Sequence, residues 1–227
     1  RALSQKSRAD FKMDISGYGN QGAAVTPRSY ALNIFNIKEG FASDQEINVA
    51  KGRSNLKIGK YFQTIVQKFF GTRENNHIIE SNFSFDPKVL ETRNPAYLEG
   101  YWQSERYFSD IEPGIRRDFS FRHPPSEPNA RLIDDMRSTD SVSLHVRRGD
   151  YVSDKKTNQF HGTCPMSYYQ SAFAYVSERT SDPKLFIFSD DVEWAKKNLR
   201  FDCPTVFVEG NDREKSYEDM RLMSECQ

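Results

Sequence analysis

The last third of the chain alternates short apolar runs with segments in which apolar residues recur at helical spacing. The runs predict buried strands and the helical spacing predicts amphipathic helices. Strands and helices in alternation, joined by short loops, are typical of a parallel, doubly wound sheet, so we expect an α/β fold. The expected order is strand 141–146, helix 166–176, strand 185–188, helix 192–199, strand 205–208 and helix 216–223.

The expected helix starts carry residues that favour them. Pro165 opens the first of these helices, and Asp190 or Asp191 stands where the second needs a cap. Ser216 with Asp219 resembles a capping box for the third.

The first 140 residues have a weaker pattern. The clearest helix is 55–70, whose apolar residues keep helical spacing and end at a glycine. Proline is frequent in 109–130, which favours a connecting segment. The other expected elements are the tail of a helix at 1–9, strands at 11–15, around 32–34, at 77–80 and at 97–102, and a short helix at 131–136 with Asn129 as its cap.

Composition excludes several classes of protein. The 32 basic and 32 acidic residues give a net charge of zero, which argues against a dedicated nucleic-acid binder. With 17 Phe and 11 Tyr, the chain is too aromatic for a disordered protein. It has no apolar run long enough for a membrane span and no signal peptide. Three cysteines without metal-ligand spacing predict reduced thiols in a cytosolic protein, not a disulfide framework or a zinc site.

In a doubly wound sheet the binding crevice lies at the carboxyl ends of the strands. The first of these strands is followed by Arg147, Arg148, Gly149 and Asp150. Arginines there need an anion, and their planar forks match phosphate oxygens. Asp150 would orient an arginine or accept a proton. A surface ion pair between Arg148 and Asp150 explains the pattern equally well, so both interpretations stay open.

Two further segments allow more than one interpretation. After the next strand, Ser189, Asp190 and Asp191 either cap the following helix or accept hydrogen bonds from a nucleotide. The segment Tyr97–Phe108 is rich in aromatic residues, which either belong to a core or offer faces on which sugar rings stack. The polar loop 209–212 has no readable role.

Four segments together resemble the α-1,2-fucosyltransferases. They are His145–Tyr151, Phe188–Trp194, Tyr97–Phe108 and Asp219–Ser224, and the first, His-x-Arg-Arg-Gly-Asp-Tyr, is the most specific. The likeness covers almost the whole chain. It implies a glycosyltransferase B fold of two Rossmann-like domains. Residues 1–139 would form the acceptor-side domain, and 140–227 the domain that binds GDP-fucose, with a parallel sheet.

The resemblance also implies the reaction. An inverting, metal-independent enzyme without a cofactor would move L-fucose from GDP-fucose to the 2-hydroxyl of a galactose-containing glycan. Arg147 and Arg148 would contact the diphosphate, His145 would line the nucleotide site, and Ser189 and Asp190 would contact the nucleoside.

Without a metal, another group must stabilise the charge that develops on the departing diphosphate. We expect Arg147 to do so. Asp150 and Asp154 are the carboxylates placed to serve as the base, and Asp150 is assigned with Arg147 to the catalytic site.

The sequence departs from the family pattern at its ends. The family opens with a glycine-rich strand–turn–helix and has a Ser-Trp-Trp-Gly-type motif beyond the point where this chain stops. We therefore expect a fold incomplete at both termini, and a chain that is inactive by itself. The parent enzyme is expected in the cytoplasm, associated peripherally with the inner membrane face, or in the Golgi lumen if it is eukaryotic. The alternatives are a glycosyltransferase for another nucleotide sugar and a non-catalytic module that binds glycans or nucleotides.

Overall fold

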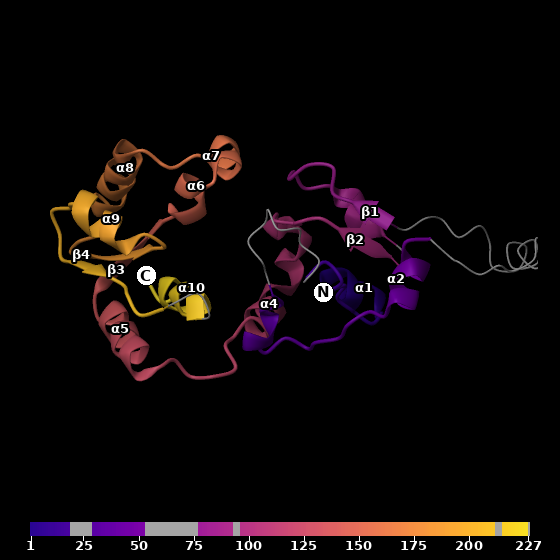
Figure 1. Cartoon of the computed structure of the whole chain (residues 1–227). Helices are drawn as coiled ribbons and strands as arrows, with labels where there is room; N and C mark the ends of the chain where they lie inside the picture. Colours follow the sequence, from indigo (N-terminus) through magenta and orange to yellow (C-terminus); the bar gives the residue numbers. More distant parts are fainter. Residues whose placement is uncertain (19–28, 53–76, 93–95, 212–214, 227) are drawn as a thin grey trace, which may run out of the picture. The chain divides into compact units, whose positions relative to one another are not determined.

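The chain forms two compact units, Arg1–His123 and Pro124–Gln227 (Figure 1). The division precedes the expected boundary at 139/140, because the helix before the first strand of the second unit packs on that unit's sheet. The computed structural model describes residues 1–18, 29–52, 77–92, 96–211 and 215–226.

The second unit is built on a three-stranded parallel sheet in the order β3-β4-β5. Val146 is aligned with Ser189, and Ile187 with Phe207. The carboxyl ends of β3 and β4 therefore lie side by side. The predicted strands and their parallel α/β arrangement are confirmed. Their bounds are β3 Asp140–Val146, β4 Pro183–Ser189 and β5 Thr205–Phe207.

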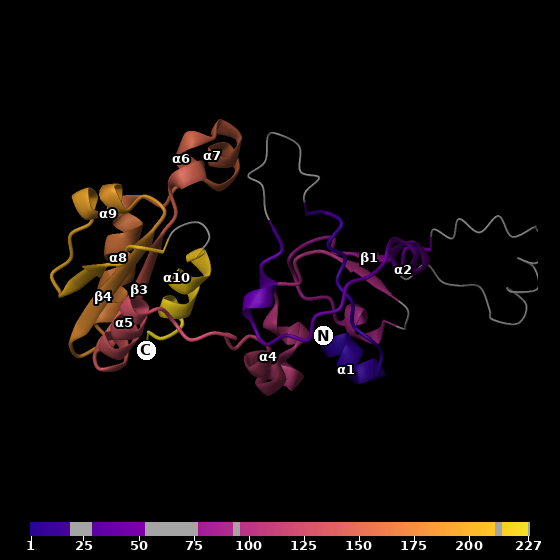
Figure 2. The ribbon, with the colours of Figure 1, turned by 60° about the horizontal axis from the view of Figure 1, so that its bottom comes forward.

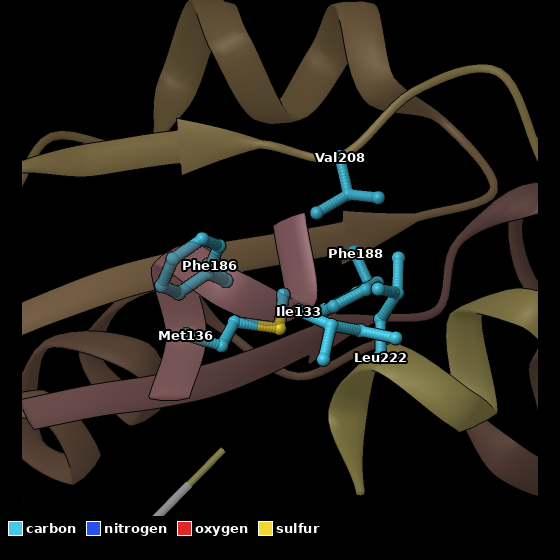
Figure 3. Close-up of a cluster of buried hydrophobic side chains, with 6 residues drawn as sticks. All are labelled: Ile133, Met136, Phe186, Phe188, Val208 and Leu222. Carbon is cyan, nitrogen blue, oxygen red and sulfur yellow. The ribbon is translucent and has the colours of Figure 1, made fainter. Parts of the chain in front are cut away.

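Helices cover both faces of this sheet (Figures 1 and 2). One face carries α5 (Glu127–Arg137) and α10 (Ser216–Met223), and the other carries α8 (Met166–Ser177) and α9 (Val192–Asn198). The side chains of β4 alternate between the faces, as a strand requires. Figure 3 shows the cluster on the α5/α10 face: Ile133, Met136, Phe186, Phe188, Val208 and Leu222. The opposite cluster is Val146, Tyr169, Leu185, Ile187, Ala195 and Leu199.

The observed helix starts differ from the predicted ones in two helices, α5 and α10. Ser126 precedes α5, and Asn129 is buried within that helix instead of capping it. The capping box at Ser216 is also wrong, because Lys215 occupies the N-cap position of α10 and Asp219 accepts a hydrogen bond from Asn211. In both cases a polar side chain is engaged by a tertiary contact that local spacing does not reveal. The starts of α8 after Pro165 and of α9 after Asp191 are confirmed.

Two short helices follow β3, α6 (Gly149–Ser153) and α7 (Lys155–His161), where the sequence indicated a loop. Asp154 caps α7 by accepting a hydrogen bond from the Thr157 backbone N–H at 2.7 Å. Gly162 ends α7 with a φ of 65°.

The first unit contains a two-stranded parallel sheet, which confirms the strands expected at 77–80 and 97–102 over shorter spans. The sheet consists of β1 (His77–Ile79) and β2 (Tyr97–Glu99). The other described elements are α1 (Ala2–Ser7), η1 (Leu32–Ile34), α2 (Asp44–Ala50), η2 (Pro87–Glu91), η3 (Glu105–Tyr107), η4 (Ser109–Ile111) and α4 (Glu112–Asp118).

Some expectations for this unit are wrong. Residues 32–34 form the short helix η1, and the strand-like contact comes at Phe35, which bridges Phe121 and packs on Phe119. The strand at 11–15 is a single bridge from Met13 to Phe41. The connecting segment 109–130 includes η4, α4 and the start of α5. The helix expected at 55–70 lies outside the described residues.

Candidate functional site

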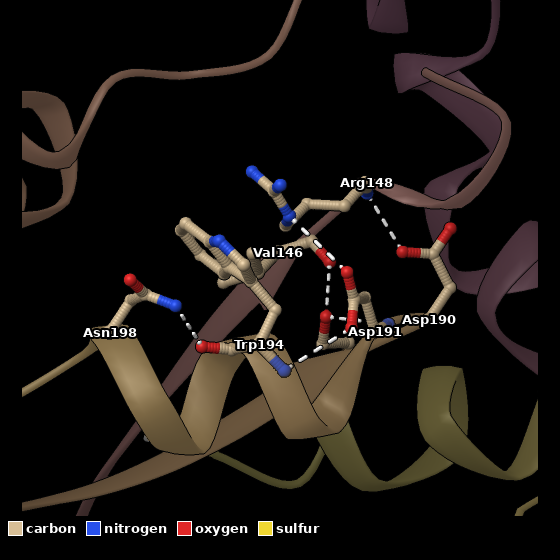
Figure 4. Close-up of polar contacts among 7 residues, drawn as sticks. Val146, Arg148, Asp190, Asp191, Trp194 and Asn198 are labelled. Atoms are coloured by element: carbon tan, nitrogen blue, oxygen red, sulfur yellow. Dashed lines mark hydrogen bonds and ion pairs between the residues drawn. The ribbon is translucent and has the colours of Figure 1, made fainter. Parts of the chain in front are cut away.

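The carboxyl ends of β3 and β4 bring together the charged residues that the sequence indicated. Arg147 and Arg148 follow β3, and Asp190 and Asp191 follow β4. Figure 4 shows Arg148, Asp190 and Asp191 at this edge. Neighbouring parallel strands end at one edge, so residues 42 or 43 positions apart are in contact.

Arg147 lies between two carboxylates. Its Nη2 is 2.8 Å from Asp150 Oδ1, and its Nη1 is 2.9 Å from Asp190 Oδ2. The guanidinium also lies 5.6 Å from the ring centre of Tyr151, and 45% of the side chain is exposed. The ion pair between Arg148 and Asp150 considered from the sequence is therefore wrong, because Asp150 pairs with Arg147.

Arg148 points toward α9 and is more buried, at 18% exposure. Its guanidinium lies 3.7 Å from the ring centre of Trp194, within cation–π distance (Figure 4). Its Nε is 3.5 Å from Asp191 Oδ2. The aromatic plane and the carboxylate fix the direction of this side chain at the edge of the sheet.

Asp190 links the two loops through both of its oxygens. Oδ1 accepts a hydrogen bond from the Arg148 backbone N–H at 2.7 Å, while Oδ2 pairs with Arg147. The carboxylate lies so close to Gly149 that a Cβ there would be 2.6 Å from Oδ2. Glycine at 149 is therefore required by a close approach.

Ser189 and Asp191 complete the connection between the strands. The Ser189 hydroxyl donates to the Val146 carbonyl at 2.8 Å and accepts from the Asp191 backbone N–H at 3.0 Å. Asp191 in turn accepts a hydrogen bond from the Trp194 backbone N–H, so it caps α9 as one sequence interpretation proposed. The contact between Ser189 or Asp190 and a nucleoside stays a prediction.

His145 is exposed and lies on the face of the sheet that carries α10. Asp219 of α10 lies close enough to His145 for a positive charge on the imidazole to lower the pKa of this carboxyl. Burial raises the pKa of Asp219, and the hydrogen bond from Asn211 at 2.7 Å only partly opposes this. Asn211 also accepts a hydrogen bond from the buried Asn129.

Sequence reasoning missed the part that three residues play at this edge. Trp194 belongs to the segment Phe188–Trp194 that the sequence indicated. It lies three residues after the cap Asp191, in the first turn of α9, and this spacing could have placed it beside the strand ends. Asn211 lies in the polar loop 209–212, for which the sequence indicated no role. The sequence indicated Asn129 only as a helix cap, because its side-chain partners lie 82 and 89 positions away.

The arrangement is suited to an anion. An arginine carries five N–H donors in a planar fork, so the two carboxylate contacts that the structure describes for Arg147 leave donors for a further anion. Among the described residues, no three His, Cys, Asp or Glu side chains gather as a metal site.

Comparison with known proteins identifies the family. The family model described as glycosyl transferase family 11 matches residues 53–227. This range includes the whole edge formed by β3, β4 and their loops. The chain belongs to glycosyl transferase family 11.

Individual relatives agree with this family. The O-antigen biosynthesis glycosyltransferase WbnK of Escherichia coli is 40% identical over 100% of this chain and 76% of its own length. An alpha-1,2-colitosyltransferase of Escherichia coli is 32% identical over 98% of this chain and 73% of its own length. Galactoside alpha-(1,2)-fucosyltransferase 1 of Rattus norvegicus is 28% identical over 57% of this chain and 36% of its own length.

No solved structure significantly matches this family 11 chain. None of the helices in the described parts of the chain has the length and apolar character needed to cross a membrane.

Proposed function

We propose that this family 11 glycosyltransferase moves L-fucose from GDP-fucose to the 2-hydroxyl group of a galactose-containing glycan. The observation that carries the proposal is the arginine pair at the carboxyl end of β3, held by Asp150, Asp190 and Asp191. The name of the rat relative, a galactoside alpha-(1,2)-fucosyltransferase, supports the choice of sugar and linkage. The glycosyltransferase B arrangement expected from the sequence belongs to the same proposal.

The proposed reaction exchanges one bond at the anomeric carbon of fucose. The bond from C1 to the β-phosphate oxygen breaks, and its electron pair leaves with GDP. The acceptor 2-oxygen forms the new bond from the opposite face of the ring and gives up its proton. Charge therefore grows on the diphosphate as the transition state is reached. A cation held in place before the reaction stabilises that charge more strongly than it stabilises the bound donor.

We assign the main stabilisation of the charge on the diphosphate to Arg147, because it is the more exposed arginine. Its guanidinium is also oriented by a carboxylate on each side, Asp150 and Asp190. Arg148 is directed by Trp194 and Asp191, and we assign it to binding the diphosphate. His145 lines the nucleotide site in this proposal.

The contacts also distinguish the carboxylates considered as bases. The backbone N–H of Thr157 and further hydrogen bonds lower the pKa of Asp154, which makes it a weaker base. Asp150 is 2.8 Å from Arg147, which supports its role in orienting the arginine. The acceptor proton then passes to Asp150 or to water late in the reaction.

Substitution of Arg147 tests the proposal. In Arg147→Ala we expect kcat for fucose transfer to fall by about 10²–10³-fold, the usual effect of removing one preorganised donor. Arg147→Lys keeps the charge but loses the fork, so it should restore only part of the rate. Transfer is measured in the parent enzyme, because this chain is expected to be inactive by itself, with radiolabelled GDP-fucose and a galactoside at saturating donor and acceptor.

Arg131→Ala is the matched control, because Arg131 is an exposed arginine in an ion pair on α5 of the same unit. Its kcat should stay within twofold of the wild type, as is usual for an exposed surface pair. Unchanged kcat in Arg147→Ala, with only weaker donor binding, would contradict the catalytic assignment and leave Arg147 as a residue that only binds the donor.

Colitose is the second candidate sugar, because a relative that covers 98% of the chain is named a colitosyltransferase. Colitose is fucose without its 3-hydroxyl group, and the arginine pair contacts the diphosphate that both donors share. Competition between GDP-fucose and GDP-colitose in one reaction decides between them. A kcat/KM that is more than about 10²-fold higher for one donor than for the other would identify the sugar. A site that hydrogen-bonds the 3-hydroxyl of fucose discriminates strongly against a sugar that lacks this group.

A further inference from the structure

Phe83 and Tyr101 form an exposed aromatic pair in the first unit. Their exposed fractions are 67% and 76%, and their ring centres lie 5.9 Å apart in an edge-to-face contact. Phe83 follows β1 and Tyr101 follows β2, so the parallel sheet brings them together. Two large rings that contact each other and remain open to solvent indicate a surface made for a ligand. We call this pair the aromatic shelf.

The backbone that carries Tyr101 is held in an unusual turn. The Glu80 carboxylate accepts hydrogen bonds from the backbone N–H groups of Tyr101 and Trp102, at 2.6 and 3.2 Å. Trp102 has a φ of 51°, a left-handed conformation that is rare for a bulky residue. A Cβ at Gly100 would lie 2.4 Å from the Cβ of Glu80. The turn is therefore fixed by specific contacts, and strained turns of this kind occur mainly at functional sites.

A pocket of about 240 Å³ is lined by residues adjacent in sequence to the two shelf rings. Its lining includes the chain neighbours of the shelf, Asn82 and Ser84 beside Phe83, and Trp102 beside Tyr101. Tyr107 forms another part of the wall, and its ring contacts Trp102 edge to face. The loop that carries Phe83 thus also supplies hydroxyl and amide groups to the pocket, where Asn82 Oδ1 accepts a hydrogen bond from the Ser84 backbone N–H.

We propose that the shelf and this pocket bind a hexose ring of the acceptor glycan. This inference rests on the proposed function, because it names the acceptor site of that reaction. One face of a pyranose such as galactose presents C–H groups, which pack on the negative face of an aromatic ring. The hydroxyl groups around the ring need donors and acceptors, which Ser84 and Asn82 provide at the edge of the pocket.

The size and chemistry of the site favour a sugar over a protein partner. The pocket is smaller than the roughly 300–1,000 Å³ of sites for drug-sized ligands, so it suits a single ring. An apolar peptide anchor would bury the polar lining of the pocket without partners, which is unfavourable. A sugar supplies both an apolar face and hydroxyl groups.

The test replaces each ring separately, as Phe83→Ala and Tyr101→Ala. We expect the acceptor KM to rise about tenfold in each, while the KM for the nucleotide sugar and its slow hydrolysis without acceptor stay unchanged. Tyr175→Ala is the matched control, because Tyr175 is 61% exposed and lies near the end of α8 in the other unit. Its acceptor KM should match that of the wild type.

A binding measurement separates this inference from the proposed function. Saturation-transfer NMR with methyl β-galactoside and no donor should give a signal for the wild type and for Tyr175→Ala, and a much weaker one for Tyr101→Ala. Binding of this kind together with no fucose transfer by the parent enzyme would overturn the proposed function and leave the sugar site standing. Normal transfer with an unchanged acceptor KM and unchanged NMR signal in both shelf variants would overturn the sugar site. Circular dichroism confirms that the variants are folded.

Discussion

At the scale of single residues, Asp190 determines the shape of the candidate site. The sequence allowed it to cap a helix or to contact a nucleoside, and the structure gives the capping contact to Asp191. Asp190 instead holds the Arg148 backbone and the Arg147 side chain with one carboxylate. Gly149 leaves the space that this carboxylate occupies. The placement of both arginines thus depends on a pair of residues outside the arginine dipeptide.

The contact between Gly149 and Asp190 gives a prediction for a double-mutant cycle. Gly149→Ala places a Cβ at 2.6 Å from Asp190 Oδ2, so the carboxylate must move away from Arg147. We expect a loss of stability on the order of 1–2 kcal/mol together with slower transfer. In the Asp190→Ala background the added Cβ no longer meets a carboxylate, so the same substitution should have a smaller effect. Urea unfolding and kcat measured on all four proteins give the coupling.

Gly17→Ala is the control for the loss of a glycine, because a Cβ there meets no atom within 4 Å. Its unfolding free energy should stay within about 0.5 kcal/mol of the wild type. Additive effects of Gly149→Ala and Asp190→Ala would show that the close approach is unimportant.

Asp219 gives a prediction for the pH dependence of stability. Burial raises its pKa above the ordinary value of 3.8, so the folded protein holds this proton more tightly than the unfolded chain does. Its stabilising contribution is therefore complete below the unfolded pKa and is lost as the pH rises through the folded pKa. Asp219→Asn has no such titration.

The unfolding free energy of the variant minus that of the wild type should therefore be larger at pH 7 than at pH 3.5, as measured by urea unfolding at both pH values. Asp134→Asn, at an exposed position on α5, is the control. An equal difference at the two pH values would contradict the prediction.

At the scale of elements, the sequence predicted the sheet of the second unit well and the first unit poorly. β4 is a continuous apolar run because helices cover both of its faces, and such runs are easy to recognise. α5 begins four residues before the expected start. Ser126 occupies its N-cap position, and Pro128 fits in the first turn because the N–H that proline lacks has no partner there. The sequence predicted a strand where η1 lies, because Leu32 and Ile34 have aromatic residues around them. In the structure the ring contacts come from Phe35, and the Ile34 carbonyl accepts a hydrogen bond from the Arg122 backbone N–H.

The candidate site was likewise predicted only in part from the sequence. Local order in the sequence placed Arg147, Asp150 and Asp190 at the ends of neighbouring strands, since a parallel sheet requires it. It could not say which carboxylate pairs with which arginine. That choice depends on α6, a helix of one turn that follows Arg148 and brings Asp150 back toward Arg147. Short helices of this kind form through tertiary contacts more than through propensity.

Helix α10 gives a prediction about packing. Leu222 is fully buried against α5 and β4, whereas Met220, two residues earlier, is 44% exposed. Leu222→Ala should lower the unfolding free energy by about 2–5 kcal/mol, because the cavity lies in a close-packed cluster. Met220→Ala removes a side chain of similar size from the same helix and should cost less than about 1 kcal/mol. Urea unfolding followed by circular dichroism measures both. Equal losses would show that α10 does not pack as described.

At the scale of the whole molecule, the division into two compact units has a thermodynamic consequence. Each unit has buried side chains of its own, such as Phe35 and Tyr107 in the first and Phe186 and Leu222 in the second. We therefore expect each unit to unfold in a cooperative transition of its own. The two proposed binding sites also belong to different units, the arginine edge to the second and the aromatic shelf to the first.

Differential scanning calorimetry should therefore resolve two transitions. Leu222→Ala should lower the Tm of one of them, and Phe35→Ala, which removes a buried ring packed on Phe119 and Phe121, should lower the Tm of the other. In a unit of about 100 residues each loss of 1 kcal/mol shifts Tm by roughly 4–8 °C, so a core substitution moves its own transition by a readily measured amount. GDP in excess should raise the Tm of the transition that Leu222→Ala lowers, because a ligand stabilises the unit that binds it. A single transition moved by both substitutions would mean that the units unfold as one and that the arginine edge and the aromatic shelf are thermodynamically coupled.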